Sequence, residues 1–586
     1  MLRSRILFSR FLTLDFCSAG FPGSVLNLAL ILALMMVPVT ILDPLLGSPG
    51  RAAHLPTWTL STRAPILGTP KMADLDGDGT QEIILTTYAR DDNPYGGGYV
   101  HVMEPNGAER PGWPYNDQRA PIPATAAVGD VDRDGLGEIV VGSWSRLYVF
   151  KPDGTIAPGF PLPLGTWETA ALSDVNRDGM LEIIYPSLNQ LYILDHAGAA
   201  LPGWPYSIQS DYYIGSPAVG DIDGDGEVEI VAGSAKGPVD YVPFRVYAWE
   251  IDGTLKAGWP FVTSGVVKAA PALADMDGDG DLEIAVDAYE ASDRDRLYLL
   301  QGDGTLLPGW PQIAGGSRLS PPALADLNGD GRAEIIVGGF DPDSYEGMLY
   351  AFHADGSVPP GFPVLLPHGG QVNDSPIALD LDGDPARIEI LVKNANYFHG
   401  YHSDGSLMAG FPFYLNDHSY SGTTSPGPLA GDVDHDGDAE LILASCHDVV
   451  YFFDSYGPMN PDLAYWPTYK HDAWNTGSGG ARLRSDVLAP GRMPETASTA
   501  LRCYPNPFRE RTWFALGGES ARPGGALVLF DAMGRRIRSW RISGDAGGTG
   551  LLSWDGRDEV GLPLPAGTYF ARAGDAGTGI RVVLVK

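Results

Sequence analysis

Cysteine is scarce in this chain of 586 residues. Of its three cysteines, Cys17 lies in an apolar N-terminal stretch, which leaves Cys446 and Cys503 for the rest of the chain. Two cysteines cannot build a disulfide framework or a paired-cysteine zinc site. The fold must therefore be stabilised by other means.

Positive charge is scarce too, because 39 Lys and Arg stand against 73 Asp and Glu, giving a formal net charge of −34. Such a chain repels nucleic-acid phosphates and anionic lipid headgroups, so we expect no nucleic-acid partner and no binding to a membrane surface. Hydrophobic residues still make up 44% of the chain, which is enough for a buried core and excludes wholesale disorder.

The usual signals of catalysis are missing as well. The sequence contains no Gly-x-Ser-x-Gly elbow, no phosphate-binding glycine-rich loop and no His-Glu-x-x-His motif. The histidines His353, His399, His402, His418 and His471 are scattered, and we expect them to be structural or solvated. No catalytic residue is predicted, and a binding protein is favoured over an enzyme.

A long uncharged run near the N-terminus is the first positive signal. Arg3, Arg5 and Arg10 precede residues 17–42, which contain no charged side chain. This pattern predicts a secretory signal peptide or an uncleaved N-terminal anchor over residues 1–53. We therefore expect a protein that is secreted or held at the cell surface.

An acidic loop recurs through the rest of the chain at intervals of about 51 residues, the length of a four-stranded propeller blade. Gly or Pro interrupts nearly every window of helix length, so the pattern predicts an all-β fold. We expect an eight-bladed β-propeller over residues 54–477, and a seven-bladed ring with one outlying repeat is the alternative. Residues 55–62 are expected to supply the outer strand of the last blade.

A Gly-aromatic-Pro signature follows the third strand of each repeat. We expect each aromatic ring to be a wedge packed between neighbouring blades, because a single repeat cannot bury its own face. Stacking on a sugar is the alternative. The signature occurs at 111–114, 158–161, 202–205, 257–260, 308–311, 360–363 and 409–412, and the eighth copy, AYWP at 464–467, lacks the Gly.

Oxygen-bearing side chains occupy positions 1, 3, 5 and 9 of each acidic loop, except that the seventh loop has one extra residue before its Glu. A Gly at position 6 permits a sharp turn in all but the seventh. Hard oxygen ligands in this number are typical of calcium, whereas magnesium demands stricter octahedral geometry. Position 7 varies in chemistry, as expected for a backbone carbonyl ligand. Eight copies in register argue against ordinary solvated turns.

The predicted sites for up to eight calcium ions differ in quality. Asn176 and Asn328 replace an Asp at position 3, so the third and sixth sites should bind more weakly. The seventh loop has Pro385 in place of the Gly and is the weakest candidate. The candidate ligands are Asp74, Asp76, Asp78 and Glu82; Asp130, Asp132, Asp134 and Glu138; Asp174, Asn176, Asp178 and Glu182; Asp221, Asp223, Asp225 and Glu229; Asp275, Asp277, Asp279 and Glu283; Asp326, Asn328, Asp330 and Glu334; Asp380, Asp382, Asp384 and Glu389; and Asp432, Asp434, Asp436 and Glu440.

These loops and their spacing resemble the FG-GAP or VCBS repeats of integrin α-subunit propellers and of many bacterial surface proteins. The resemblance covers residues 60–477. It implies a calcium-stabilised propeller that presents loops to a protein or glycan ligand. The chain departs from it in number, since integrin propellers have seven blades and this sequence has eight loops.

The C-terminal part differs in composition. Residues 478–500 read as a linker, and the alternating strands and Gly/Pro turns of residues 501–586 predict a small β-sandwich. Its YPNPF start at 504–508 and its WDG run at 554–556 resemble the Ig-like C-terminal domain of flagellar hook-capping proteins and of type IX secretion cargo. The resemblance implies recognition by outer-membrane secretion machinery, and a generic stabilising module is the alternative.

We therefore expect a monomeric, exported, calcium-binding propeller that acts as a binding or adhesion module. The longest loops, at 88–98, 237–244 and 340–347, follow the second strands of their repeats and are the candidate recognition surface. Two alternatives stay open. One is a calcium-dependent polysaccharide lyase, because some rhamnogalacturonan lyases resemble this chain as eight-bladed calcium propellers, and the other is a purely structural surface protein.

Overall fold

The computed structural model describes most of residues 56–478 and, beyond residue 501, chiefly strands. The predicted signal peptide or anchor and nearly all of the predicted linker lie outside the described residues. Within the described part, no helix is long and apolar enough to cross a membrane. The residues outside the description are 1–55, 63, 89–96, 209–211, 237–243, 268, 290–294, 315–319, 342–343, 345, 369, 382–383, 385–386, 395–396, 416–425, 447, 455–464, 474, 479–501, 505–511, 517–525, 532–534, 542–549, 555–556, 558–561, 563, 565–566, 574–579 and 585–586.

All the elements are β-strands, so the predicted all-β class is confirmed. Between residues 58 and 453 they form eight antiparallel sheets, numbered here in the order of their acidic loops. Sheet 1 contains β2 (Lys71–Ala73), β3 (Glu82–Thr86), β4 (Tyr99–Met103) and β5 (Tyr115–Asn116); sheet 2, β6 (Ala127–Gly129), β7 (Glu138–Gly142) and β8 (Leu147–Phe150); sheet 3, β9 (Ala171–Ser173), β10 (Glu182–Ser187), β11 (Gln190–Leu194) and β12 (Tyr206–Ser207); sheet 4, β14 (Ala218–Gly220), β15 (Glu229–Lys236), β16 (Phe244–Trp249) and β17 (Phe261–Thr263), with β13 (Tyr212–Ile214) also paired to β15; sheet 5, β18 (Ala272–Ala274), β19 (Glu283–Ala288), β20 (Arg296–Leu300) and β21 (Gln312–Ile313); sheet 6, β22 (Ala323–Ala325), β23 (Glu334–Asp341), β24 (Glu346–Phe352) and β25 (Val364–Leu366); sheet 7, β26 (Ile377–Leu379), β27 (Glu389–Asn394), β28 (Tyr397–His402) and β29 (Phe413–Tyr414); and sheet 8, β30 (Leu429–Gly431), β31 (Glu440–Ala444), β32 (Val449–Phe453) and β1 (Trp58–Ser61).

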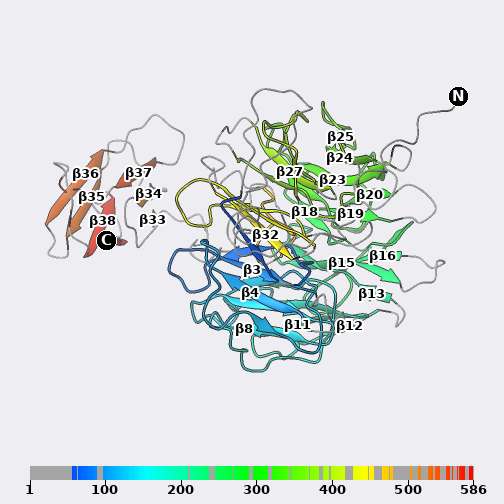
Figure 1. The fold of residues 1–586 in the computed structure, drawn as a ribbon, viewed down its shortest axis with the longest axis horizontal. Coiled ribbons are helices and arrows are strands. Elements are labelled where there is room, and N and C mark those ends of the chain that lie inside the picture. The colour runs from blue at the N-terminus through cyan, green and yellow to red at the C-terminus, as the bar shows by residue number, and fades with distance from the viewer. Residues whose placement is uncertain are drawn as a thin grey trace, which may run out of the picture. The chain divides into compact units, whose positions relative to one another are not determined.

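The sheets follow one another in chain order, and the yellow β32 of sheet 8 lies beside the blue β3 of sheet 1 (Figure 1). This is the arrangement of a β-propeller. The second strand of each sheet opens with Glu and continues with three buried apolar residues, as in the fully buried β7. Neighbouring sheets cover both of its faces, so the strand needs a continuous apolar run rather than an alternating one.

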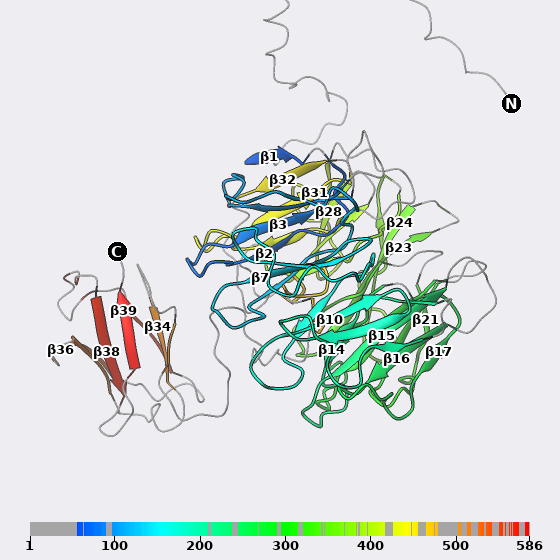
Figure 2. The same ribbon diagram turned by 90° about the horizontal axis from the view of Figure 1, so that it is seen from below.

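The predicted outer strand before the first repeat is confirmed. β1 pairs antiparallel with β32, with Trp58 opposite Phe452 and Ser61 opposite Val449. The rings of Trp58 and Phe452 stack with centroids 4.9 Å apart. Figure 2 shows β1 beside β32 and β31, so the first and last strands of this part of the chain share one sheet. This pairing removes a free strand edge.

The signature tryptophans are wedges between consecutive sheets, as predicted. Each is at most 8% exposed, which makes the sugar-stacking alternative wrong for these rings. In the four regular signatures that contain Trp, the indole Nε1–H also donates to a backbone carbonyl in the turn after the third strand of the next sheet. The pairs are Trp113 with Pro152 O at 2.9 Å, Trp204 with Ile251 O at 2.8 Å, Trp259 with Gly302 O at 2.9 Å and Trp310 with Ala354 O at 2.7 Å.

The last signature copy leads into a segment that the sequence did not predict. Residues 465–478, which we call the closing segment, run past the first strands of several sheets. Trp466 and Ala378 exchange two backbone hydrogen bonds, and the Nζ of Lys71 donates to the carbonyls of Tyr469 and Asp472 at 2.6 and 2.7 Å. Further backbone hydrogen bonds reach this segment from Val128, Val219, Leu273 and Ala430.

The closing segment therefore ties together strands from sheets 1, 2, 4, 5, 7 and 8. It also buries two amines, and this burial lowers the pKa of Lys71 and of Lys470 to about 7. The missing Gly of the eighth signature has a physical reason, because the chain here leads into the closing segment and not into a ninth sheet of the same series.

The strands beyond residue 501 form two antiparallel sheets. One contains β33 (Arg502–Tyr504), β34 (Thr512–Leu516) and β37 (Gly550–Trp554), and the other contains β36 (Arg536–Arg541), β35 (Ala526–Asp531), β38 (Gly567–Ala573) and β39 (Ile580–Leu584). The rings of Trp554 and Tyr569, one from each sheet, meet edge-on at 5.2 Å, and both residues are buried. The identity of this part as an Ig-like sorting domain stays a prediction.

The signature glycines generate a prediction about stability. Gly203 has φ +91°, and a Cβ there would lie 2.0 Å from the carbonyl oxygen of Asp252 in the next sheet. Gly203→Ala should therefore lower the free energy of unfolding by about 3 kcal/mol, from backbone strain plus the clash. Gly79→Ala is the control, because Gly79 has φ +92° but no atom within 4 Å, and it should lose only about 1 kcal/mol. Urea unfolding in chelator measures both, and equal losses would contradict the close approach.

Candidate metal centres

Each acidic loop joins the first and second strands of its sheet, and its position-9 glutamate opens the second strand. One carboxylate oxygen of this glutamate accepts the backbone N–H of loop position 2, as in Leu75 N–H to Glu82 Oε2 at 2.9 Å. The position-1 Asp accepts the N–H of the position-6 Gly, as in Gly79 to Asp74 at 3.0 Å. The eight glutamates are Glu82, Glu138, Glu182, Glu229, Glu283, Glu334, Glu389 and Glu440, and none is more than 2% exposed.

Five loops bring three carboxylates close enough to share one ion. In each group, one oxygen per residue lies within 4.8 Å of the others. The first, fourth and fifth loops contribute positions 1, 3 and 5, whereas the second and eighth contribute positions 1, 3 and 9. The groups are Asp74, Asp76 and Asp78; Asp130, Asp132 and Glu138; Asp221, Asp223 and Asp225; Asp275, Asp277 and Asp279; and Asp432, Asp434 and Glu440.

The third, sixth and seventh loops are different among the described residues. In the third and sixth, an amide donates to the buried glutamate, from Asn176 to Glu182 at 2.8 Å and from Asn328 to Glu334 at 2.9 Å. The amide nitrogen, which cannot bind a cation, faces that carboxylate. In the seventh loop, Asp382 lies outside the described residues. These are the three loops that the sequence predicted to bind most weakly.

Burial dominates the electrostatics of the position-9 glutamates. It raises the pKa of Glu283 to about 7 and that of Glu440 to about 8, and neighbouring loop aspartates raise both further. Such a carboxylate is costly as an anion unless a cation or hydrogen-bond donors compensate its charge.

Basic side chains supply that charge in three loops, which the sequence analysis did not predict. The ammonium of Lys151 lies 2.5 Å from Asp132, 2.9 Å from Asp134 and 2.9 Å from Glu138. Arg110 contacts positions 3 and 9 of the first loop at 2.5 and 2.6 Å, and Lys256 contacts the same positions of the fourth at 2.6 and 3.2 Å. Each comes from the same sheet, at or after the end of its third strand.

Two of the scattered histidines contact the buried glutamates of their loops as the basic side chains do. The Nδ1 of His353 lies 2.8 Å from Glu334 in the sixth loop, and that of His402 lies 2.9 Å from Glu389 in the seventh. Lys151 and His353 directly follow the third strands of their sheets, and His402 is the last residue of its third strand. Alignment of the repeats at this position is the sequence signal that could have found them.

The fifth and eighth loops have no such partner among the described residues. In the eighth, Asp432 Oδ1 and Glu440 Oε1 are buried without a hydrogen-bond partner, and Glu440 is 0% exposed. Cation ligands would be left in this condition if the ion were taken away. The donor set of the eighth loop therefore fits a hard divalent cation, and the fifth loop offers three converging carboxylates of the same kind.

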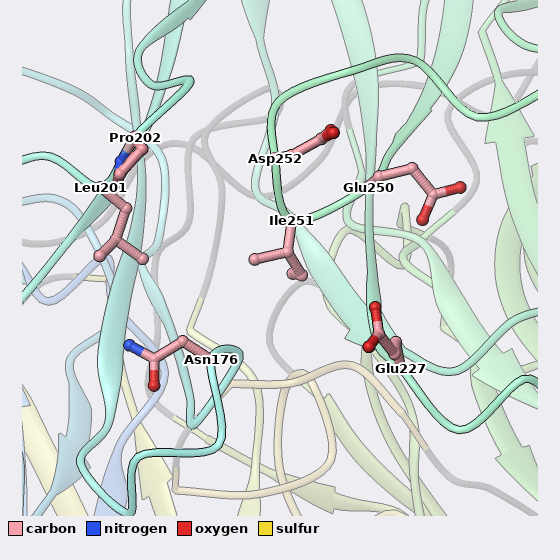
Figure 3. A pocket seen from close by; sticks show the side chains of 7 residues that line it. All are labelled: Asn176, Leu201, Pro202, Glu227, Glu250, Ile251 and Asp252. Carbon is pink, nitrogen blue, oxygen red and sulfur yellow. The ribbon is translucent and has the colours of Figure 1, made fainter.

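A pocket lies between the third and fourth loops. Figure 3 shows Leu201 and Ile251 on opposite sides of it, above Asn176 and Glu227 from the two loops. Glu227, Glu250 and Asp252 make the lining acidic, and no basic residue lines it. Since two of its residues belong to acidic loops, the pocket is a rim of the candidate metal sites and not a separate centre.

Comparison with known proteins identifies the repeats. The FG-GAP-like repeat family matches residues 74–141, 174–232 and 288–337. Two of these matches begin at the position-1 residues Asp74 and Asp174 of acidic loops. The chain therefore carries FG-GAP-like repeats, as its sequence predicted. A search of curated proteins gave no match.

Solved structures share the architecture at low sequence identity. The V. cholerae biofilm matrix protein Bap1 matches with 16% identity and a TM-score of 0.51, over 75% of this chain and 96% of that one. The Dos1 propeller matches at 12% and 0.44, over 69% and 96%. A Bacillus licheniformis rhamnogalacturonan lyase, PL11, matches at 15% and 0.38, over 75% and 81%. At this identity, the likeness to Bap1 concerns the fold alone.

The internal cations generate a prediction. In chelator, Lys256→Met should cost about 2–4 kcal/mol of stability, because it leaves the buried Glu229 without its counter-charge. The control is Glu250→Gln, which removes the charge of only the third and longest contact of Lys256, at 3.3 Å, and should cost less than about 1 kcal/mol. Thermal and urea unfolding compare the two, and equal losses would show that the ammonium does not balance the loop.

Proposed function

We propose that this chain is a secreted or cell-surface binding module, an eight-bladed calcium-stabilised propeller that presents a protein or glycan ligand site and has no catalytic role. One observation carries the proposal. Among the described residues, the end of the sheets with the acidic loops repeats one kind of loop and one kind of turn from sheet to sheet, whereas the opposite end varies. There the hairpin between second and third strands spans residues 188–189 in sheet 3 but residues 87–98 in sheet 1.

The constant end, with the acidic loops, stabilises the fold, and the variable end is available for recognition. The constant end is fixed by buried glutamates and wedged tryptophans, so changes there would damage the fold. Loops at the variable end can change without disturbing the sheets, and such loops are where binding surfaces develop on rigid scaffolds. The long loops at 88–98, 237–244 and 340–347 belong to this end, although most of their residues lie outside the described part.

Eight blades are supported by two features of the described residues. Eight sheets occur between residues 58 and 453, each with one acidic loop, and β1 completes sheet 8 by pairing with β32. The closing segment then bonds to first strands on several sides. A seven-bladed ring would have to exclude one of these sheets, although all eight open their second strand with the same buried glutamate.

Calcium fits the loops unequally. The fifth and eighth loops offer converging oxygens with no internal cation, so they should bind an ion first. In the first, second and fourth loops, a calcium ion would have to displace Arg110, Lys151 or Lys256 from its carboxylates. Extracellular modules bind calcium at roughly 10⁻⁴ to 10⁻³ M, so each occupied site adds about 0.4 to 1.4 kcal/mol in millimolar calcium.

The C-terminal sheets are proposed to serve export. Support comes from the YPNPF and WDG motifs of residues 501–586 and from the uncharged run near the N-terminus. In this reading, outer-membrane secretion machinery recognises the C-terminal part while the propeller carries the ligand site. Efficient secretion of a chain that lacks residues 501–586 would overturn this part of the proposal.

The unequal loops give a prediction about stoichiometry. After dialysis in about 1 mM calcium, near the affinity range of extracellular modules, metal analysis should find fewer bound ions than loops. The pair Asp277→Ala and Asp279→Ala should remove one ion, the pair Asp132→Ala and Asp134→Ala should remove none, and Lys151→Met should add one. Loss of an ion from the second loop as well would show that Lys151 does not occupy the site.

The binding role is tested by screening the calcium-loaded protein against protein and glycan arrays. We expect saturable binding to at least one class of ligand, and weaker binding after chelation has loosened the acidic loops. In parallel, the protein is incubated with rhamnogalacturonan and other acidic polysaccharides, and ultraviolet absorbance follows unsaturated products. Steady product formation would replace the binding role with a lyase activity.

A further inference from the structure

Three aromatic side chains from separate connections meet at the variable end of the sheets. Trp144 lies in the hairpin between β7 and β8, Trp167 in the connection from sheet 2 to sheet 3, and Tyr88 beyond the end of β3. The rings of Trp144 and Trp167 lie 4.6 Å apart between centroids, and Tyr88 lies 5.6 Å from the first and 5.8 Å from the second. We call these three residues the aromatic platform.

The aromatic platform is exposed to solvent, whereas the signature tryptophans are buried. Trp167 is 55% exposed and Trp144 is 37% exposed, whereas the signature tryptophans are at most 8% exposed. Indole is the largest apolar side chain that a protein can bury, so two neighbouring indoles in water forgo several kcal/mol of burial. An exposed apolar cluster of this kind on a soluble fold marks an interaction site.

The backbone holds the platform in a fixed shape. The N–H of Trp144 donates to Pro121 O at 3.2 Å, and the N–H of Thr166 donates to Ser143 O at 2.9 Å. Gly165 lets the two loops approach, since a Cβ there would lie 2.1 Å from the carbonyl oxygen of Trp144. The rings are therefore presented by two loops that are hydrogen-bonded to each other, and little ordering is left for the moment of binding.

The size of the platform decides between classes of partner. An aromatic side chain contributes about 150–250 Å² when fully buried, so three partly exposed rings offer at most a few hundred Å². A stable protein interface buries roughly 1,200–2,000 Å² in total, which is well beyond this. A small ligand with flat apolar faces and polar edges fits better. A pyranose ring has this character, with axial C–H groups on its faces and hydroxyls around its edge.

Ring geometry and charge narrow the ligand further. The planes of Trp144 and Trp167 are inclined by 40°, so two successive sugar units could each lie on one indole. The carboxylate of Glu168 accepts a hydrogen bond from Ser216 Oγ at 2.9 Å and interacts with Tyr469 and the buried Lys470 of the closing segment, so it is not part of the platform. The charge argument rests on the chain as a whole, whose formal net charge of −34 would repel a negatively charged glycan but not a neutral one.

We propose that Tyr88, Trp144 and Trp167 form a binding site for an uncharged, pyranose-containing glycan. The proposal rests on the binding role given above and assigns that role a ligand class and a site. The sugar rings stack on the two indole rings. The sugar hydroxyls form hydrogen bonds with the polar groups around the platform. The site involves no bond making or breaking.

The test uses the full exported chain with calcium and a panel of neutral and acidic oligosaccharides. Wild type should bind neutral oligosaccharides, with quenching or a shift of tryptophan fluorescence. Trp167→Ala should weaken binding at least tenfold, and the double variant Trp144→Ala and Trp167→Ala should abolish it. Tyr414→Ala is the matched control, since Tyr414 is 52% exposed on the outer strand of sheet 7, and it should bind like wild type. Unfolding temperatures of all variants should stay close to that of wild type.

The possible failures are distinguishable. Wild-type affinity in the double variant would overturn the site but leave the binding role standing. Binding of wild type to acidic glycans or to proteins only would overturn the ligand class. A mass of two copies in sedimentation that Trp167→Ala reduces to one would make the platform a contact between copies of the chain and would overturn the glycan proposal. Binding to nothing in either array would remove the binding role itself.

Discussion

Each sheet of the propeller depends on one buried carboxylate, the glutamate that opens its second strand. This glutamate holds the acidic loop in shape by accepting a backbone N–H, and its burial makes an uncompensated charge expensive. Different groups contact this glutamate in different loops. They are a guanidinium or an ammonium in some loops and an imidazole or an amide in others. The fold therefore keeps one geometry while its charge balance varies from sheet to sheet, and only some loops are left for an external cation.

Much of the fold could be predicted from the sequence because short motifs determine each sheet and recur in every repeat. The spacing of the acidic loops predicted the succession of sheets. The aromatic residue of each signature predicted which side chain packs between neighbouring sheets. The pairing of β1, Trp58–Ser61, with the last sheet was also predictable, since a propeller needs a strand to cover the free edge of that sheet. The ligand positions in the loops follow from the same repetition, although the repeat alone does not show which loops already contain a cation.

What the sequence could not show comes from contacts between distant or non-repeated positions. Lys151 faces its loop only because the third strand returns beside the second, and the residue type at this place differs from one repeat to the next. The closing segment bonds to strands hundreds of residues earlier, and only the degenerate eighth signature hinted at it. Trp144 and Trp167 belong to different connections, so their proximity depends on the placement of whole sheets.

The pairing of β1 with β32 also governs when the fold can be completed. A chain is synthesised from its N-terminus, so residues 58–61 emerge long before their partners at 449–452. Until the later strand arrives, sheet 8 does not exist and β1 has an open edge that can recruit other chains. Completion of the ring of sheets therefore comes late, because it waits for the synthesis of residues 449–452.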